Sequence, residues 1–143
     1  MGIQPATPEL ERFVRDSLGC TCPAEVFERV DDSPSELSQA AGIERRIAIG
    51  GRLLIYMASV DSCSLAVAKL SDWIQVGISE RDAGGMNRLR LVLLMDGRAA
   101  DEMQRIEAAF ERALPDGDER VHLHLLDPVS AFPLQEAHPP KIA

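Results

Sequence analysis

Long apolar runs and basic residues are both scarce in this chain of 143 residues. No apolar run approaches the roughly 18 residues that a membrane-spanning helix needs. The first residues, MGIQPATPELERFVRD, have neither the basic segment nor the apolar stretch of a secretory signal. We therefore expect a cytoplasmic location and no membrane partner.

Acidic residues exceed basic ones by 23 to 15, which gives a formal net charge of −8. A molecule with this charge repels phosphate backbones, although a local basic patch is compatible with the total. Nucleic acid is therefore not an expected partner. The chain also lacks GxSxG, HExxH, a paired CxxC and the glycines and lysine of a P-loop. These absences favour a protein that is not an enzyme.

The composition, with 45% hydrophobic and 27% charged residues, is typical of one globular domain with a buried core. Residues 1–143 are expected to form a single domain, in which the proline-rich segment 128–143 is a surface or frayed tail. Helix-start signals at Thr7 and Pro8 and a stop at Gly19 predict a first helix. Its buried side follows a helical spacing: Leu10, Phe13, Val14 and Leu18.

A second, short helix is predicted to begin at Pro23, with Thr21 or Cys22 as its cap. Two β-rich runs then flank Gly50 and Gly51, a pair that permits the positive φ angles of a tight turn. Residues 43–59 therefore predict an antiparallel hairpin. Its first strand alternates like an edge strand, and its second is apolar on both faces like a central one.

Helices predicted over 62–79 and 98–114 alternate with apolar strands at 88–95 and 120–126. Helices between apolar strands imply parallel pairing through right-handed crossovers. The predicted fold class is α/β: one domain with a mixed sheet of about four strands, built from N-terminal helices, a ββ hairpin and two βα crossovers.

Two of the three cysteines, Cys20 and Cys22, stand in one CxC tripeptide. A helix N-terminus at Pro23 would favour the thiolate of Cys22. Cys63 follows the predicted central strand and could converge with them. Such a set can bind a soft metal such as zinc or cycle through a disulfide, and no other cofactor is required. A purely structural role also stays open, since cysteine is among the most buried residue types.

Polar residues collect at the predicted carboxyl ends of the strands, where open α/β sheets bind ligands. They predict a small-ligand pocket built from Ser59, Asp61, Ser62 and Asp96. His122 and His124 project from one face of the last strand, as metal-binding histidines can. No third ligand has a helpful spacing, which favours two histidines on the wetter face of that strand.

Three functions stay open on this basis. The first is a protein-binding or accessory domain that engages a protein partner or forms a homodimer through the hairpin edge at Ile47 and Ile49. The second is a thiol redox or thiolate metal-binding protein that uses Cys20, Cys22 and Cys63. The third is a protein with a small-ligand pocket at the carboxyl ends of the strands.

Overall fold

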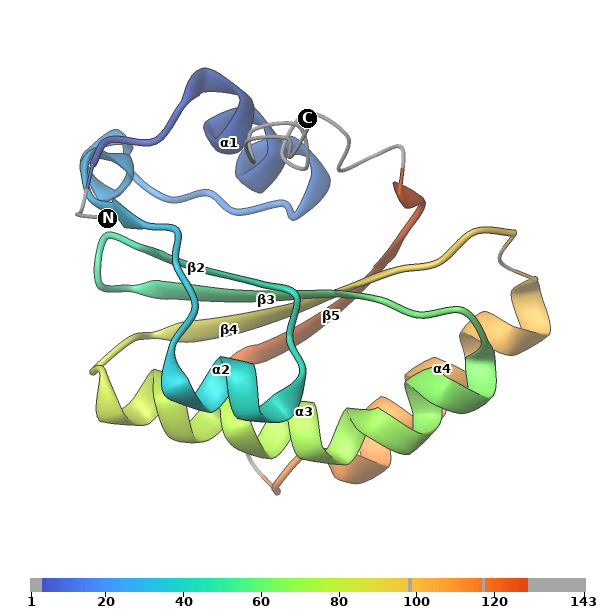
Figure 1. Cartoon of the computed structure of the whole chain (residues 1–143). Helices are drawn as coiled ribbons and strands as arrows, with labels where there is room; N and C mark the ends of the chain where they lie inside the picture. Colours follow the sequence, from blue (N-terminus) through green and yellow to red (C-terminus); the bar gives the residue numbers. More distant parts are fainter. Residues whose placement is uncertain (1–3, 98, 117, 129–143) are drawn as a thin grey trace, which may run out of the picture.

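The computed structural model describes residues 4–97, 99–116 and 118–128. One mixed sheet has the strand order β1-β2-β3-β4-β5, and helical segments lie on both of its faces (Figure 1). The strands are β1 (Val30–Asp31), β2 (Arg45–Ile49), β3 (Leu53–Ser59), β4 (Arg88–Leu94) and β5 (Val121–Leu126). The predicted single α/β domain is therefore confirmed, with five strands instead of about four.

Four α-helices accompany the sheet among the described residues. They are α1 (Pro8–Arg12), α2 (Glu36–Ala41), α3 (Cys63–Ala83) and α4 (Ala100–Ala113). The N-terminal region adds the π-helical segment η1 (Phe13–Ser17), which continues α1, and the 3-10 helix η2 (Ala24–Glu28). Within the part of the chain that the structure describes, no helix has both the length and the apolar character needed to cross a membrane.

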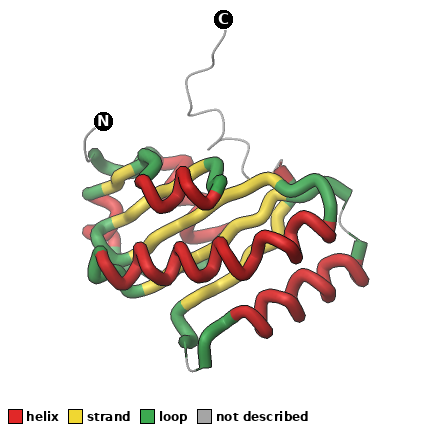
Figure 2. The backbone as a smooth tube through the Cα atoms, turned by 60° about the horizontal axis from the view of Figure 1, so that its bottom comes forward, coloured by secondary structure: helices red, strands yellow, loops and turns green. Residues whose placement is uncertain are grey.

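The hairpin and both crossovers occur where the sequence predicts them. β2 and β3 pair antiparallel, with Ile49 opposite Leu53, and Gly50 and Gly51 between them have φ angles of 62° and 66°. β3, β4 and β5 run parallel to one another. α3 and α4 connect these strands and lie side by side on one face of the sheet (Figure 2).

Two apolar layers sandwich the sheet. α2, α3 and α4 pack on one face, against side chains such as Leu54 and Leu91. The N-terminal segment packs on the other face, against Ile47 and Ile55. The predicted helical stripe is confirmed, since all of its members are buried in this second layer: Leu10, Phe13, Val14 and Leu18.

Two expectations for the N-terminal half were wrong. β2 is not an edge strand, because β1 pairs with it and places Val30 opposite Ile49. Ile47 and Ile49 are fully buried, so the hairpin edge that suggested a protein partner or homodimer is covered. The second helix is only a 3-10 segment whose N-cap is Pro23, and no side chain caps it, so Cys22 does not.

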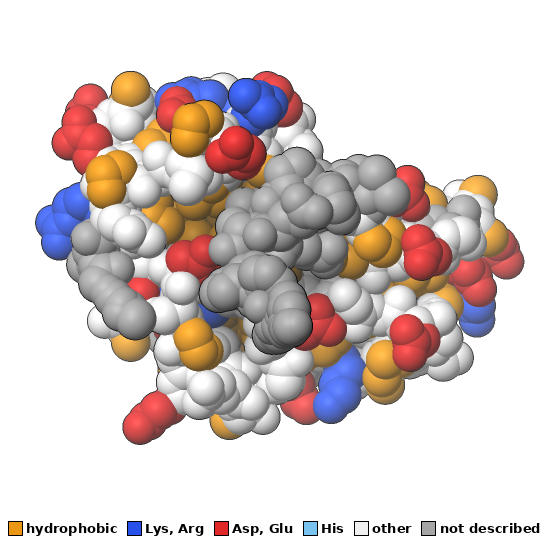
Figure 3. Space-filling model, turned by 45° about the horizontal axis from the view of Figure 1, so that its top comes forward, with side chains coloured by type: hydrophobic (Ala, Val, Ile, Leu, Met, Phe, Trp, Pro, Cys, Tyr) orange, Lys and Arg blue, Asp and Glu red, His pale blue; other side chains and the backbone are white. Residues whose placement is uncertain are grey.

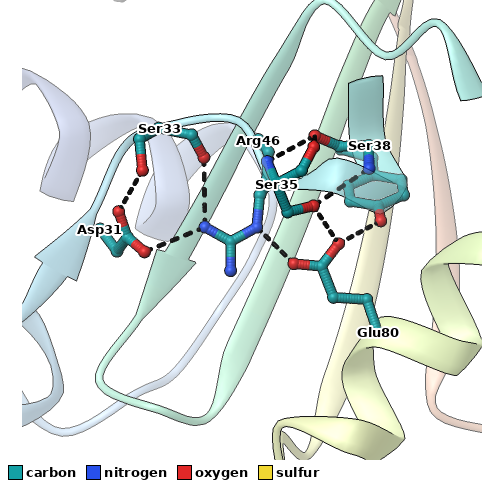
Figure 4. Close-up of polar contacts among 7 residues, drawn as sticks. Asp31, Ser33, Ser35, Ser38, Arg46 and Glu80 are labelled. Atoms are coloured by element: carbon teal, nitrogen blue, oxygen red, sulfur yellow. Dashed lines mark hydrogen bonds and ion pairs between the residues drawn. The ribbon is translucent and has the colours of Figure 1, made fainter. Parts of the chain in front are cut away.

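A buried polar network fastens α2 and β2 to α3. Glu80 of α3 accepts hydrogen bonds from Tyr56, Arg46 and Ser35, as Figure 4 shows. Arg46 also pairs with Asp31 at 3.1 Å. Burial and the hydrogen bond to Glu80 raise the pKa of Tyr56, which keeps its hydroxyl protonated as a donor. These side chains provide hydrogen-bond partners for one another, as expected of a network with a structural role.

Candidate functional site

Cys20 and Cys22 are joined by a disulfide across Thr21, with their Cα atoms 5.5 Å apart. Gly19 turns the chain out of η1 with a φ of 72°, a conformation that glycine adopts without strain. The backbone N–H of Cys20 donates to the carbonyl of Val14 at 3.1 Å, which holds the loop on the helical segment. Both cysteines are half-buried against the N-terminal layer, so the disulfide remains partly accessible to solvent.

A cavity of about 340 Å³ lies beside this loop. One wall is the loop itself, residues 19–23 together with Val26. The other wall comes from the amino ends of β3, β4 and β5. It contains Leu53 and five polar or basic residues: Arg52, Asn87, Arg88, Arg90 and His122. The disulfide and the basic side chains therefore line the same space.

The basic side chains reach this face because side chains alternate along a strand. In β4, Leu89 and Leu91 join the layer of α3 and α4, while Arg90 lies on the face of Val92, which joins the N-terminal layer. In β5, His122 lies opposite Arg90 in the parallel register. The N-terminal layer contacts the later residues of β4, and the cavity occupies the amino ends of β4 and β5.

Each of two arginines faces a histidine in this cluster. Nη1 of Arg88 lies 3.0 Å from Nε2 of His122, and Nη1 of Arg90 lies 3.0 Å from Nε2 of His124. Nη1 of Arg90 also donates to the carbonyl of Leu18 at 2.8 Å. Nε of Arg90 is buried and lacks a hydrogen-bond acceptor among the described residues. The cluster therefore holds one buried donor, Nε of Arg90, that no described acceptor satisfies.

Burial and neighbouring charges set the protonation of the cluster. Burial lowers the pKa of Arg90, and Arg88 adds to this effect. Burial, followed by the charge of Arg90, lowers the pKa of His124 to about 4 and also lowers that of His122. Both histidines are therefore neutral at pH 7, and the positive charge of the site resides on the arginines.

The structure does not bring the three cysteines together. Cys63 is 4% exposed and packs in the layer of α3 and α4, across the sheet from Cys20 and Cys22. Its Sγ lies 3.7 Å from the carbonyl oxygen of Glu102. A three-thiolate zinc site is therefore not formed. Among the described residues, no group of three histidine, cysteine or acidic side chains could hold a metal ion.

The four polar residues predicted to form a ligand pocket lie at the opposite end of the parallel strands from this cavity. Ser62 is the N-cap of α3 and accepts from the N–H of Leu65, and Ser59 donates to Glu44. Asp61 and Asp96 are exposed. Two of these side chains thus have local structural contacts, and a pocket built from all four stays a prediction.

Sequence reasoning missed the arginines of the cavity. The signal is present in the alternation RLRL at 88–91 and HLHL at 122–125, which places arginines and histidines on one face of adjacent strands. Comparison of the chain with protein-family models, with curated proteins and with solved structures finds no match. The function proposed below therefore depends on the geometry of this site.

Proposed function

We propose that the protein is a thiol–disulfide redox protein whose reactive pair is Cys20 and Cys22. The observation that carries this proposal is the position of their half-buried disulfide in the wall of a 340 Å³ cavity that also contains arginine side chains. A substrate of low mass can reach both features from the same space.

The short loop that this disulfide closes limits the stability it can add to the fold. The entropy that a disulfide removes from the unfolded chain grows with the length of the loop it closes. A loop of three residues gains roughly half of the ~3 kcal/mol expected for a 15-residue loop. Cys20 and Cys22 are two residues apart, so their bond is expected to stabilise the fold less than a disulfide that closes a long loop.

The redox step is an exchange with a thiol substrate. A substrate thiolate attacks Sγ of one cysteine, a mixed disulfide forms, and the other cysteine leaves as a thiolate that takes up a proton. A second substrate thiolate then attacks the substrate sulfur of the mixed disulfide. This releases the oxidised substrate as a disulfide and leaves two reduced cysteines. Two electrons pass from two substrate thiols to the protein, and the reverse sequence reoxidises it.

The arginines of the cavity support the reactivity of the reduced pair. A positive charge near a thiol favours its thiolate, which is the nucleophile and also the better leaving group. Arg52 and Arg88 line the same cavity as both cysteines. These arginines are therefore expected to favour thiol–disulfide exchange by the reduced pair.

The test is redox equilibration of the folded protein with defined ratios of reduced and oxidised dithiothreitol, followed by mass spectrometry after alkylation. Wild type and Cys63→Ser are expected to cycle between oxidised and reduced forms, while Cys20→Ser and Cys22→Ser do not. Trapping of a mixed disulfide on either single-serine variant supports the exchange. Resistance of the folded wild-type disulfide to excess reduced dithiothreitol would overturn the proposal.

A further inference from the structure

We infer that the cavity beside Cys20 and Cys22 recognises the carboxylate of a small thiol and presents the sulfur of that thiol to the disulfide. The sulfur chemistry of this inference rests on the proposed redox function, whereas the anion site stands on separate observations. These observations are the unpaired charge, the fixed geometry and the size of the cavity.

Positive charge without an ion-pair partner gathers at the cavity beside the disulfide. The net charge is −8, and Asp and Glu side chains are spread over the face that carries the N-terminal segment (Figure 3). The buried arginines elsewhere in the fold have carboxylate partners: Arg45 pairs with Asp32, Arg46 with Glu80 and Arg81 with Asp118.

Arg90 is partly buried and differs from these arginines, since no described carboxylate forms an ion pair with it. The exposed Arg52 and Arg88 also lack an ion pair with any described carboxylate. Buried charges and donors in proteins are normally paired. Arg90 is partly buried with an unused Nε, so the site lacks an anionic partner that a ligand can supply.

Backbone hydrogen bonds bring the main chain of Arg52 next to that of Arg88. The carbonyl of Arg52 accepts from the N–H groups of Asn87 at 2.7 Å and Arg88 at 3.1 Å. This contact fixes the end of the β2–β3 turn against the start of β4. Guanidinium groups offer planar pairs of donors that match a carboxylate, so Arg52 and Arg88 suit a carboxylate held at the open side of the cavity.

The size of the cavity favours a small substrate. Small-molecule sites commonly measure about 300–1,000 Å³, and this cavity of about 340 Å³ lies at the lower end of that range. The disulfide and the arginines line different walls of it. A molecule with a carboxylate at one end and a thiol at the other can therefore contact both walls together.

The test compares two reductants of similar size and opposite charge. 3-Mercaptopropionate carries a carboxylate, and cysteamine carries an ammonium group. The rate at which each reduces the Cys20–Cys22 disulfide is measured in wild type and in Arg52→Gln/Arg88→Gln. The ratio of the two rates, compared between proteins, removes the intrinsic difference between the two thiols.

We expect the substitutions to lower the preference for 3-mercaptopropionate about tenfold or more, as expected for the loss of charge-assisted hydrogen bonds. Both arginines are exposed, so the fold is expected to survive, which circular dichroism checks. Arg105→Gln is the matched control, because Arg105 is exposed on α4, on the far face of the sheet. It is expected to retain the wild-type ratio.

The outcomes separate the two proposals. An unchanged ratio in Arg52→Gln/Arg88→Gln, with both thiols still reducing the disulfide, would overturn the carboxylate site and leave the redox function standing. If no thiol reduces the folded protein, the redox function fails, and calorimetric titration with 3-(methylthio)propionate then tests the anion site alone. Binding to wild type that the double substitution abolishes supports the site, and absence of binding overturns it.

Discussion

Nη1 of Arg90 lies 3.0 Å from Nε2 of His124, so an arginine in β4 donates to an imidazole in β5. For Nε2 to accept, the ring must be neutral with its proton on Nδ1. Burial and the charge of Arg90 both favour that neutral form and lower the pKa of His124 to about 4. The cluster that donates to an anion thus includes a histidine that resists protonation.

This pairing predicts a loss of stability in mild acid. The pKa of an unfolded histidine is about 6.5, and that of folded His124 is about 4, so the unfolded chain takes up the proton first. The contribution of His124 is present above pH 6.5 and is lost as pH falls toward 4. Its full size is on the order of 3 kcal/mol.

His124→Gln isolates the contribution of His124 to the free energy of unfolding, because glutamine keeps a hydrogen-bond acceptor and does not titrate. The free energy of unfolding in urea, measured at pH 7, 5.5 and 4.5, is expected to fall less steeply for His124→Gln than for wild type. Parallel curves for the two proteins would show that His124 does not contribute to the pH dependence.

Asp118→Asn is expected to destabilise the protein by about 3 kcal/mol, since it breaks a buried ion pair. Asp118 accepts from both Nη1 and Nη2 of Arg81, at 3.1 and 2.9 Å, and the Arg81 side chain is 1% exposed. Urea unfolding at pH 7 measures the effect. Asp116→Asn in the same loop is the control, because Asp116 is exposed and should change stability by no more than about 0.5 kcal/mol. Equal effects of the two substitutions would contradict the role of the ion pair.

Local signals made most of the fold predictable from sequence. The alternation and paired glycines at 43–59 predict the hairpin, and the change to a helical period after Ser62 predicts the crossovers. β1 has only two residues, Val30 and Asp31, so it has no period to detect. Its pairing with β2 depends on where the N-terminal layer returns to the sheet, which is not a local property.

The site was less predictable for the same reason. Cys20 and Cys22 were identified because they stand two residues apart in one tripeptide. The interpretation of Cys22 as a helix cap was wrong, because Pro23 has an extended conformation instead of a helical one. Arg52, Arg88 and His122 line the same cavity because the register of β3, β4 and β5 places the beginnings of these strands side by side. No spacing along the chain specifies that register.

Gly50→Ala is expected to destabilise the protein more than Gly51→Ala. Both glycines have positive φ angles, so alanine at either position strains the backbone by roughly 1–2 kcal/mol. A Cβ on Gly50 would lie only 2.6 Å from the carbonyl oxygen of Val26, whereas a Cβ on Gly51 would meet nothing within 4 Å. The clash is expected to add roughly 1–3 kcal/mol, which thermal unfolding of the two variants measures. Equal melting temperatures would show that Val26 in η2 moves away from the added methyl group without a loss of stability.

Thiol counts with 5,5′-dithiobis(2-nitrobenzoate) test the pairing of the cysteines. In the folded oxidised protein, Cys63 is the one free thiol, and at 4% exposure it is expected to react slowly. Unfolding in guanidinium without reductant should release this single thiol, because the Cys20–Cys22 bond survives. Prior reduction should raise the count in the unfolded protein to three and expose two fast-reacting thiols in the folded protein.

Cys63→Ser is the control for this assignment. Its oxidised form should yield no thiol when unfolded, and its reduced folded form should retain both fast-reacting thiols, since Cys20 and Cys22 lie across the sheet from position 63. Three thiols from unreduced wild type would show that Cys20 and Cys22 are not paired in the purified protein. Rapid reaction of one thiol in folded oxidised wild type, lost in Cys63→Ser, would show instead that α3 opens often enough to expose its first turn.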